Sequence, residues 1–242
     1  GGKPQIKKAV IVAIPDDSAR CQALFDGRVQ VIRDVGERYL NKVKNNPEVE
    51  YLSRPGLGVT FLGINFGMKG PLAKRKVRQA VYLALDPKLL ISESQAEAEP
   101  TDQLVTPYIV GHLPKFSSQR PQVKEARKLL KESGYPSGFT VDLEMSQTAA
   151  LRSGSHIARQ LKQLGIKVNI KGYDWQTMFG RLDKGASPFF LIGWSNSSGD
   201  ASDFNDACLH SRVKGKYGNA NWGGYSNKEL DRQIEKSQSI ID

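Results

Sequence analysis

Two hydrophobic patterns alternate along this chain. Short runs of apolar residues, or of apolar residues alternating with polar ones, predict strands, and segments with apolar residues three or four positions apart predict helices. The predicted strands cover residues 6–14, 29–32, 49–52, 59–64, 139–145, 166–170 and 189–192. The predicted helices cover residues 19–25, 34–44, 72–85, 88–92, 121–133, 155–164, 178–184 and 202–210, and a last one begins at Asn227. Strands that alternate with helices indicate parallel βαβ units and an α/β fold.

Turn and cap residues support several of these boundaries. Gly134 and Gly165 follow two of the helices, as C-terminal caps do, and Asp174 or Thr177 caps the helix over 178–184. The segment 94–119 has little periodicity, and prolines at positions 100, 107 and 114 interrupt it. We therefore expect a long ordered loop there.

The stretch from Phe189 to Phe204 combines a buried strand with a polar loop. Phe189–Ile192 is a continuous apolar run, Gly193 and Trp194 follow it, and the loop is rich in Ser, Asn, Gly and Asp. Open α/β sheets bind ligands outside the carboxyl ends of their strands. The sequence therefore predicts a ligand site at the end of this strand.

The composition is that of an ordinary globular protein. The chain has 242 residues, of which 39% are hydrophobic and 25% charged, enough for one large domain or two modest ones. No apolar run approaches the roughly 20 residues of a membrane-spanning helix. No signal peptide is visible after Gly1, although a signal already cleaved stays an open alternative.

The net charge is +10, and a basic surface is one mark of nucleic-acid binding. Here the positive residues are scattered along the chain, and only Lys74–Arg78 is dense, at the beginning of a predicted helix. No motif interleaves basic and aromatic residues. We therefore expect no nucleic-acid partner.

The cysteines and histidines have no metal-ligand spacing, so we expect no metal site and no cofactor. Cys21 and Cys208 are either two small buried residues or one long-range disulfide. The histidines are His112, His156 and His210. The chain also lacks a nucleophile elbow, a glycine-rich phosphate loop and a carboxylate pair suited to acid–base chemistry, which argues against an enzyme.

Several segments, in their order along the chain, carry a family resemblance. They are FLGIN with PLAKRKVRQAVYLALD, VKEARKLLKESGY, IARQLKQLGIKVNI with YDWQTMFGRL, the GW pair before Asp200 and Asp203, and Asn221 through GGYSNKELDRQI. Together they resemble the family 5 extracellular solute-binding proteins of ABC transporters. Residues 6–60 fit the preceding part of that family more weakly.

The resemblance implies a type II periplasmic-binding-protein fold with two lobes, and parts of the family fold missing at both termini. Residues 1–65 are then part of a strand-rich first lobe, and 66–242 are most of the second. It implies a small-molecule or peptide solute, ABC permease subunits as partners, and a periplasmic or extracytoplasmic location. Contact with the membrane is expected only through the permease or a lipid anchor not present in this chain.

The resemblance also bears on the kind of solute. In the peptide-binding members, an Asp three residues after the Trp of the GW pair holds the amino group of the ligand, and Ser197 stands there in this chain. The Arg that holds the ligand carboxylate in the dipeptide-binding members is matched only by Arg152, which is displaced by several residues. Both departures favour a neutral or differently charged solute over a zwitterionic peptide.

The predicted ligand contacts are Trp194, Asn196, Ser197, Ser198, Asp200, Asn65 and Trp222. Trp194 either stacks on the solute or packs in the core beneath the loop. The Asn and Ser groups either bind solute or make ordinary turns, and Asp200 either binds a cation or caps the helix at Ser202. Asn65 is expected at the hinge, and Trp222 either lines the cleft or packs in the core.

The leading functional hypothesis is non-catalytic capture of a solute for an ABC importer, by closure of two lobes. The alternative is a sensor or interaction domain that reuses the solute-binding fold. An enzyme is the third class, and no catalytic residue is assigned.

Overall fold

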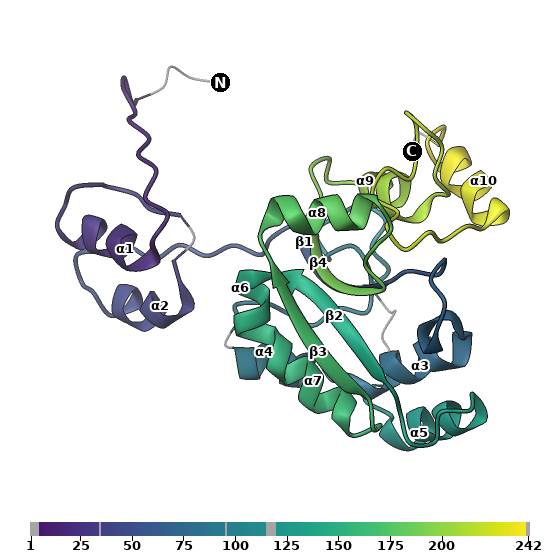
Figure 1. The fold of residues 1–242 in the computed structure, drawn as a ribbon. Helices are drawn as coiled ribbons and strands as arrows, with labels where there is room; N and C mark the ends of the chain where they lie inside the picture. Colours follow the sequence, from purple (N-terminus) through teal and green to yellow (C-terminus); the bar gives the residue numbers. More distant parts are fainter. Residues whose placement is uncertain (1–4, 34, 95, 115–119, 241–242) are drawn as a thin grey trace. The chain divides into compact units, whose positions relative to one another are not determined.

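The computed structural model describes residues 5–33, 35–94, 96–114 and 120–240. The chain divides into two compact units, Gly1–Arg54 and Pro55–Asp242, and each is described by itself (Figure 1). The structure is mixed α/β, as predicted. The lobe boundary predicted at residue 65 stays a prediction.

The first unit contains two helices, α1 (Asp17–Phe25) and α2 (Glu37–Lys44). Asp16 caps α1, because its Oδ1 accepts a hydrogen bond of 2.8 Å from the backbone N–H of Ala19. A small apolar centre between the helices buries Cys21, Ala23 and Val43. Both of these helices were predicted, although Asp34, where the second was expected to begin, lies outside the described residues.

The strands predicted at 6–14, 29–32 and 49–52 are wrong for this structure, since none of the described residues there forms a strand. Ile11 is 97% exposed, and Val31 and Leu52 are also exposed. A β-branched pattern supplies only a preference, and a strand also needs a neighbouring strand to accept its hydrogen bonds. No described segment of this unit provides one.

The second unit is built on a four-stranded sheet. Its strands are β1 (Gly58–Ile64), β2 (Thr140–Ser146), β3 (Lys167–Tyr173) and β4 (Phe189–Ser195), in the order β1-β4-β2-β3. β2 is parallel to both β3 and β4, whereas β1 runs antiparallel to β4. The prediction of parallel βαβ units therefore holds for three strands, and β1 is an antiparallel edge strand.

Helices cover both faces of this sheet. The helical segments of the unit are α3 (Arg75–Ala84), α4 (Pro87–Ser94), α5 (Val123–Glu132), α6 (Gln147–Ala149), α7 (Ser155–Lys162), α8 (Trp175–Asp183), α9 (Ser202–Phe204) and α10 (Lys228–Ser237), a 3-10 turn at Pro71–Ala73, and π-helical turns at Ala150–Gly154 and Asn205–Leu209. In the view of Figure 1, α4, α5 and α7 lie below the sheet, and α8, α9 and α10 lie above it.

Alternation along the strands separates two cores. On one face, Phe189 of β4 and Leu143 and Met145 of β2 pack with the apolar sides of α3, α5 and α7. On the other face, Phe190 and Ile192 of β4 pack with α8. Because consecutive strand residues point to opposite faces, the continuous apolar run of β4 is what a strand buried on both faces requires.

A buried ion pair holds α8 against the sheet. Glu144 of β2 is only 3% exposed. Its carboxylate accepts hydrogen bonds of 2.8 and 2.6 Å from Arg181 of α8, and one of 2.6 Å from the hydroxyl of Ser187. The alternation of residues 139–145 places Glu144 on the polar side of a strand, yet α8 covers that side. The hydrogen bond from Arg181 is the main cause that raises the pKa of the guanidinium.

Replacing Arg181 with Met should lower the free energy of unfolding by about 3 kcal/mol, because it leaves the Glu144 carboxylate buried without a counter-ion. The double variant Glu144→Leu/Arg181→Met should lose less than this single variant. Urea unfolding of the three proteins measures both values. A double variant less stable than Arg181→Met would show that the pair does not act as a unit.

Close packing of β1 on β4 depends on Gly63. A Cβ at this position would lie 2.1 Å from Cε2 of Phe190. Gly63→Ala should therefore cost about 1–3 kcal/mol of unfolding free energy by displacing the ring. The matched control is Gly180→Ala within α8, where nothing lies within 4 Å of the new Cβ. The control should be neutral or stabilising by up to about 1 kcal/mol, and equal losses in the two variants would contradict this assignment.

Candidate functional site

The predicted site lies at the edge of the sheet where the three parallel strands end. β2, β3 and β4 end at Ser146, Tyr173 and Ser195. The loop 196–201, which is rich in polar residues, follows β4 directly and leads into α9. This is the edge at which open α/β sheets bind ligands.

Asp203 organises this loop from the beginning of α9. Its Oδ1 accepts a hydrogen bond of 2.7 Å from the indole N–H of Trp194. Its Oδ2 accepts two from Ser197, 3.0 Å from the backbone N–H and 2.6 Å from the hydroxyl. One carboxylate therefore links the end of the strand, the loop and the helix.

These donors also set the ionisation of Asp203. Burial by itself raises the pKa of the carboxyl, but the hydrogen bonds from Ser197 and Trp194 outweigh burial, and the net pKa is lowered. Asp203 is therefore held as a carboxylate with its acceptors already occupied. The neighbouring Cys208 responds in the opposite way, since burial first and the charge of Asp203 second raise its pKa to about 12.

The other polar groups of the loop mostly bond to one another. The side chain of Asn196, which is buried, donates to the carbonyl of Asp200 at 2.7 Å and accepts from the N–H of Gly199 at 2.7 Å. Asp200 accepts from the N–H of Ser202, the first residue of α9, at 2.8 Å, although the N-cap position itself is held by Ala201. The hydroxyl-bearing residues Ser197 and Ser198 remain exposed.

A second loop is attached to the first. The backbone N–H of Val110 donates to the carbonyl of Gly199 at 3.0 Å, and the N–H of Ala201 donates to the carbonyl of Val110 at 2.9 Å. Val105 and Ile109 pack with Val59 and Phe204 under the site. The described parts of the predicted loop 94–119 are thus ordered where they border the strand end.

Trp194 packs in the core beneath the loop, one of the two roles that the sequence left open, and its stacking on a solute stays a prediction. It is half-buried, packs with the Phe204 cluster, and meets the Phe204 ring edge-on at 6.2 Å between centroids. Its indole N–H is committed to Asp203. Part of the ring surface remains accessible, so the side chain supports the loop and still presents an aromatic surface.

Two π-helical turns border the same edge. Ala150–Gly154 comes shortly after the end of β2, and Asn205–Leu209 comes after the loop that follows β4. Such turns are rare and are frequently found at functional sites. Sequence periodicity does not reveal them, because one inserted residue within a helix leaves the apolar pattern nearly unchanged.

Asn65 and Trp222 lie away from this edge. Asn65 follows β1, and its backbone N–H bonds to Pro188, next to the beginning of β4. Trp222 donates its indole N–H to Asp183, at the end of α8. Both residues therefore lie near the amino end of β4, whereas the loop 196–201 follows its carboxyl end. Since β4 is seven residues long, about 20 Å separates Asn65 and Trp222 from that loop. The structure thus brings five of the seven predicted contacts together.

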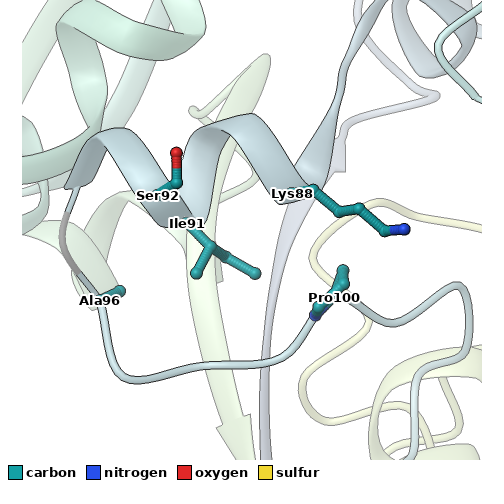
Figure 2. Close-up of a pocket in the computed structure, with 5 residues that line it drawn as sticks. All are labelled: Lys88, Ile91, Ser92, Ala96 and Pro100. Carbon is teal, nitrogen blue, oxygen red and sulfur yellow. The ribbon is translucent and has the colours of Figure 1, made fainter.

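A separate cavity of about 400 Å³ lies beside α4. It is lined by Lys88, Ile91, Ser92, Ala96 and Pro100, and Figure 2 shows these residues on α4 and the segment after it. None of the predicted ligand contacts lines it. Its lining is mainly apolar and offers few polar groups for orienting a solute.

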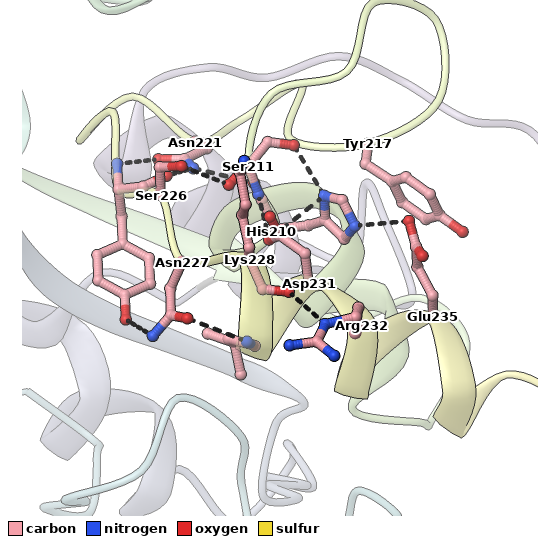
Figure 3. A network of polar contacts seen from close by, with 12 residues as sticks. His210, Ser211, Tyr217, Asn221, Ser226, Asn227, Lys228, Asp231, Arg232 and Glu235 are labelled. Atoms are coloured by element: carbon pink, nitrogen blue, oxygen red, sulfur yellow. Dashed lines mark hydrogen bonds and ion pairs between the residues drawn. The ribbon is translucent and has the colours of Figure 1, made fainter.

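A polar network holds α10 and the loop before it (Figure 3). The buried ring of His210 bonds to the carbonyl of Ser211 and to Glu235, and stacks on Tyr217 with 4.1 Å between centroids. Asp231 accepts from the N–H of Ser211 at 2.9 Å. Burial alone raises the pKa of Asp231, but the bonds from Ser211 outweigh it and the net pKa is lowered. These groups satisfy one another, which is typical of a structural role.

Metal and membrane features are absent from the described residues. No group of three or more His, Cys, Asp or Glu side chains able to hold a metal ion occurs among them. Cys21 and Cys208 are both free thiols, so no disulfide joins them. No helix in the described part of the chain has the length and apolar character needed to cross a bilayer.

The sequence matches the family described as bacterial extracellular solute-binding proteins, family 5 (middle), over residues 1–216. The chain belongs to this family, whose members are non-catalytic solute-binding proteins of ABC transporters. The predicted resemblance is confirmed.

Known relatives support the same assignment. The chain is 28% identical to heme-binding protein A of Haemophilus influenzae, with 98% of this chain and 44% of that protein covered. It is 26% identical to the dipeptide-binding protein of Escherichia coli, with 100% and 46% covered. The structure of DppA, an ABC transporter-associated periplasmic binding protein from Helicobacter pylori, matches with a TM-score of 0.84 at 22% identity, over 95% and 45% of the two chains. The chain spans about half the length of these relatives.

Replacing Asp203 with Asn should lower the free energy of unfolding by about 1–3 kcal/mol at neutral pH, because charge-assisted hydrogen bonds to Trp194 and Ser197 are lost. The pKa of Asp203 is lower in the folded state, so its contribution is complete above the ordinary Asp pKa of about 3.9 and is lost as the pH falls through the folded-state value. Unfolding measured against pH should show the two proteins converging in acid. A constant difference at all pH values would mean that the carboxylate charge is irrelevant.

Proposed function

We propose that this chain belongs to the substrate-binding component of an ABC importer and captures a small solute without catalysis. The observation that supports this most is the loop after β4, a rigid set of polar groups at the ligand-binding edge of the sheet in a chain of the solute-binding family. The E. coli relative is named as a dipeptide-binding protein, and the H. pylori structure contains the peptide STSA. A peptide-like solute is accordingly among the first to test.

The proposed contacts are Trp194, Asn196, Ser197, Ser198 and Asp200. The exposed hydroxyls of Ser197 and Ser198 and the accessible part of Trp194 contact the solute. Asn196 and Asp200 shape the loop through their internal hydrogen bonds. The carboxylate of Asp203 is already occupied by its own donors, so this residue is not assigned the role of holding an ammonium group.

The wider proposal follows from the family. The proposal keeps the two predicted lobes, residues 1–65 and 66–242, with Asn65 at the hinge between them. Trp222 is assigned to structural support of α8. The permease subunits of an importer are the protein partners. The location is periplasmic or extracytoplasmic, in keeping with a family described as extracellular.

A thermal-shift screen of the protein against peptides, oligosaccharides and metal chelates tests the proposal. A true solute should raise the unfolding midpoint with concentration, and a stabilisation of about 2.7 kcal/mol is expected at a hundredfold excess over Kd. Isothermal titration calorimetry then gives Kd. A protein that binds no member of these classes would contradict the proposal.

Ser198→Ala should weaken binding of the identified solute by about 2- to 13-fold, the equivalent of one hydrogen bond. The matched control is Ser92→Ala, which removes one hydroxyl from the cavity beside α4 (Figure 2) and should leave Kd unchanged. The reverse result, with Ser92→Ala weakening binding and Ser198→Ala neutral, would place the solute in that cavity.

A further inference from the structure

A band of positive charge lies on the second unit, on segments that the solute site does not use. We call it the basic strip. It consists of exposed side chains from α3, α5, α7 and the beginning of β3: Lys74, Arg75, Lys76, Arg127, Lys128, Lys131, Lys162 and Lys167. The carboxylates on the same segments are Glu125 and Glu132.

Side-chain contacts show that these segments form one surface. Lys74 Nζ donates to the carbonyl of Ser133 at 2.9 Å, just after α5. Lys76 pairs with Glu132 at 2.7 Å, which connects α3 to α5. Arg127 donates to the carbonyl of Gln163 at 3.2 Å, which connects α5 to the end of α7. The strip is therefore continuous across three helices.

Most of the positive charge on this surface is not neutralised. Glu132 lies between Lys76 and Lys128, and the hydrogen bond and charge of Lys76 lower its pKa, with a further contribution from Lys128. Within the described part of the chain, the side chains of Arg75, Lys131, Lys162 and Lys167 make no hydrogen bond or ion pair. Burial lowers the pKa of Arg78, and the charge of the nearby Arg75 lowers it further, which reflects crowding of like charges.

The strip lies on the side of the sheet remote from the candidate site. Lys167 begins β3, and Lys162 ends the helix that leads into it. The strip therefore borders the amino ends of the parallel strands, whereas the loop with Trp194 follows the carboxyl end of β4. In Figure 1, α3 and α5 and the end of α7 lie at the lower right, away from α8 and α9.

We propose that the basic strip binds the anionic phospholipid headgroups of a membrane surface. The chemistry favours lipid over a protein partner, because the strip is rich in lysine, which protein interfaces avoid, and poor in the aromatic residues that they favour. A lysine close to an anionic lipid surface contributes a small, additive attraction that needs no defined geometry.

Cosedimentation with phosphatidylglycerol vesicles, and with phosphatidylcholine vesicles for comparison, tests the proposal. The protein should bind the anionic vesicles only, and binding should fall steeply as salt is added. The variant Arg75→Glu/Lys131→Glu/Lys162→Glu should bind at least about a hundredfold more weakly. The control Lys214→Glu/Lys228→Glu/Lys236→Glu changes the net charge equally at exposed positions outside the strip and should retain most of the binding.

Equal losses in the two triple variants would overturn the proposal, because net charge alone would then explain binding. Equal binding to both kinds of vesicle, or to neither, would also overturn the proposal. Capture of an acidic protein in the absence of vesicle binding would assign the strip to a protein partner instead. Circular dichroism and thermal unfolding confirm that each variant folds, and Arg75→Gln/Lys131→Gln/Lys162→Gln provides a milder replacement. Solute affinity is measured separately, so failure here leaves the proposed function untouched.

Discussion

The second unit depends on one buried carboxylate. Glu144 lies within β2 on a side of the strand that is buried, and an unpaired charge there is strongly destabilising. Arg181 supplies the counter-charge from α8, and Ser187 supplies a hydroxyl from the segment that leads into β4. The same carboxylate therefore fixes the position of α8 and the point where β4 enters the sheet.

The position of β4 determines the position of the candidate site. β4 places Trp194 near its carboxyl end, and Asp203 then fastens the indole, the loop and α9 together. Most polar groups in the loop, the hydroxyls of Ser197 and Ser198 included, are hydrogen-bonded within it, so these two exposed residues stand on a rigid support. A support that is ordered before binding loses little entropy when a solute arrives, and this is how a small site gains affinity.

Most of the second unit could be predicted from the sequence. Strong amphipathic periodicity identifies the buried face of a helix, as it does in Val123–Glu132 and Lys228–Ser237. The first unit was predicted less well, because the apolar segment at residues 6–14 has the composition of a strand without a described strand to pair with. Glu144 could not be recognised as buried, because alternation shows which residues share a face and not whether a helix covers that face. Asp203 was visible as a nearby acid, but its three donors depend on the folding of the loop.

The central claim is that the solute binds at the carboxyl edge of the sheet. Amide hydrogen exchange, measured with and without a solute identified by the thermal-shift screen, tests this claim most directly. The account predicts added protection at residues 196–203 and around Val110, whose backbone is bonded to that loop. Protection confined to α4 and the segment up to Pro100, with exchange in the loop unchanged, would contradict it.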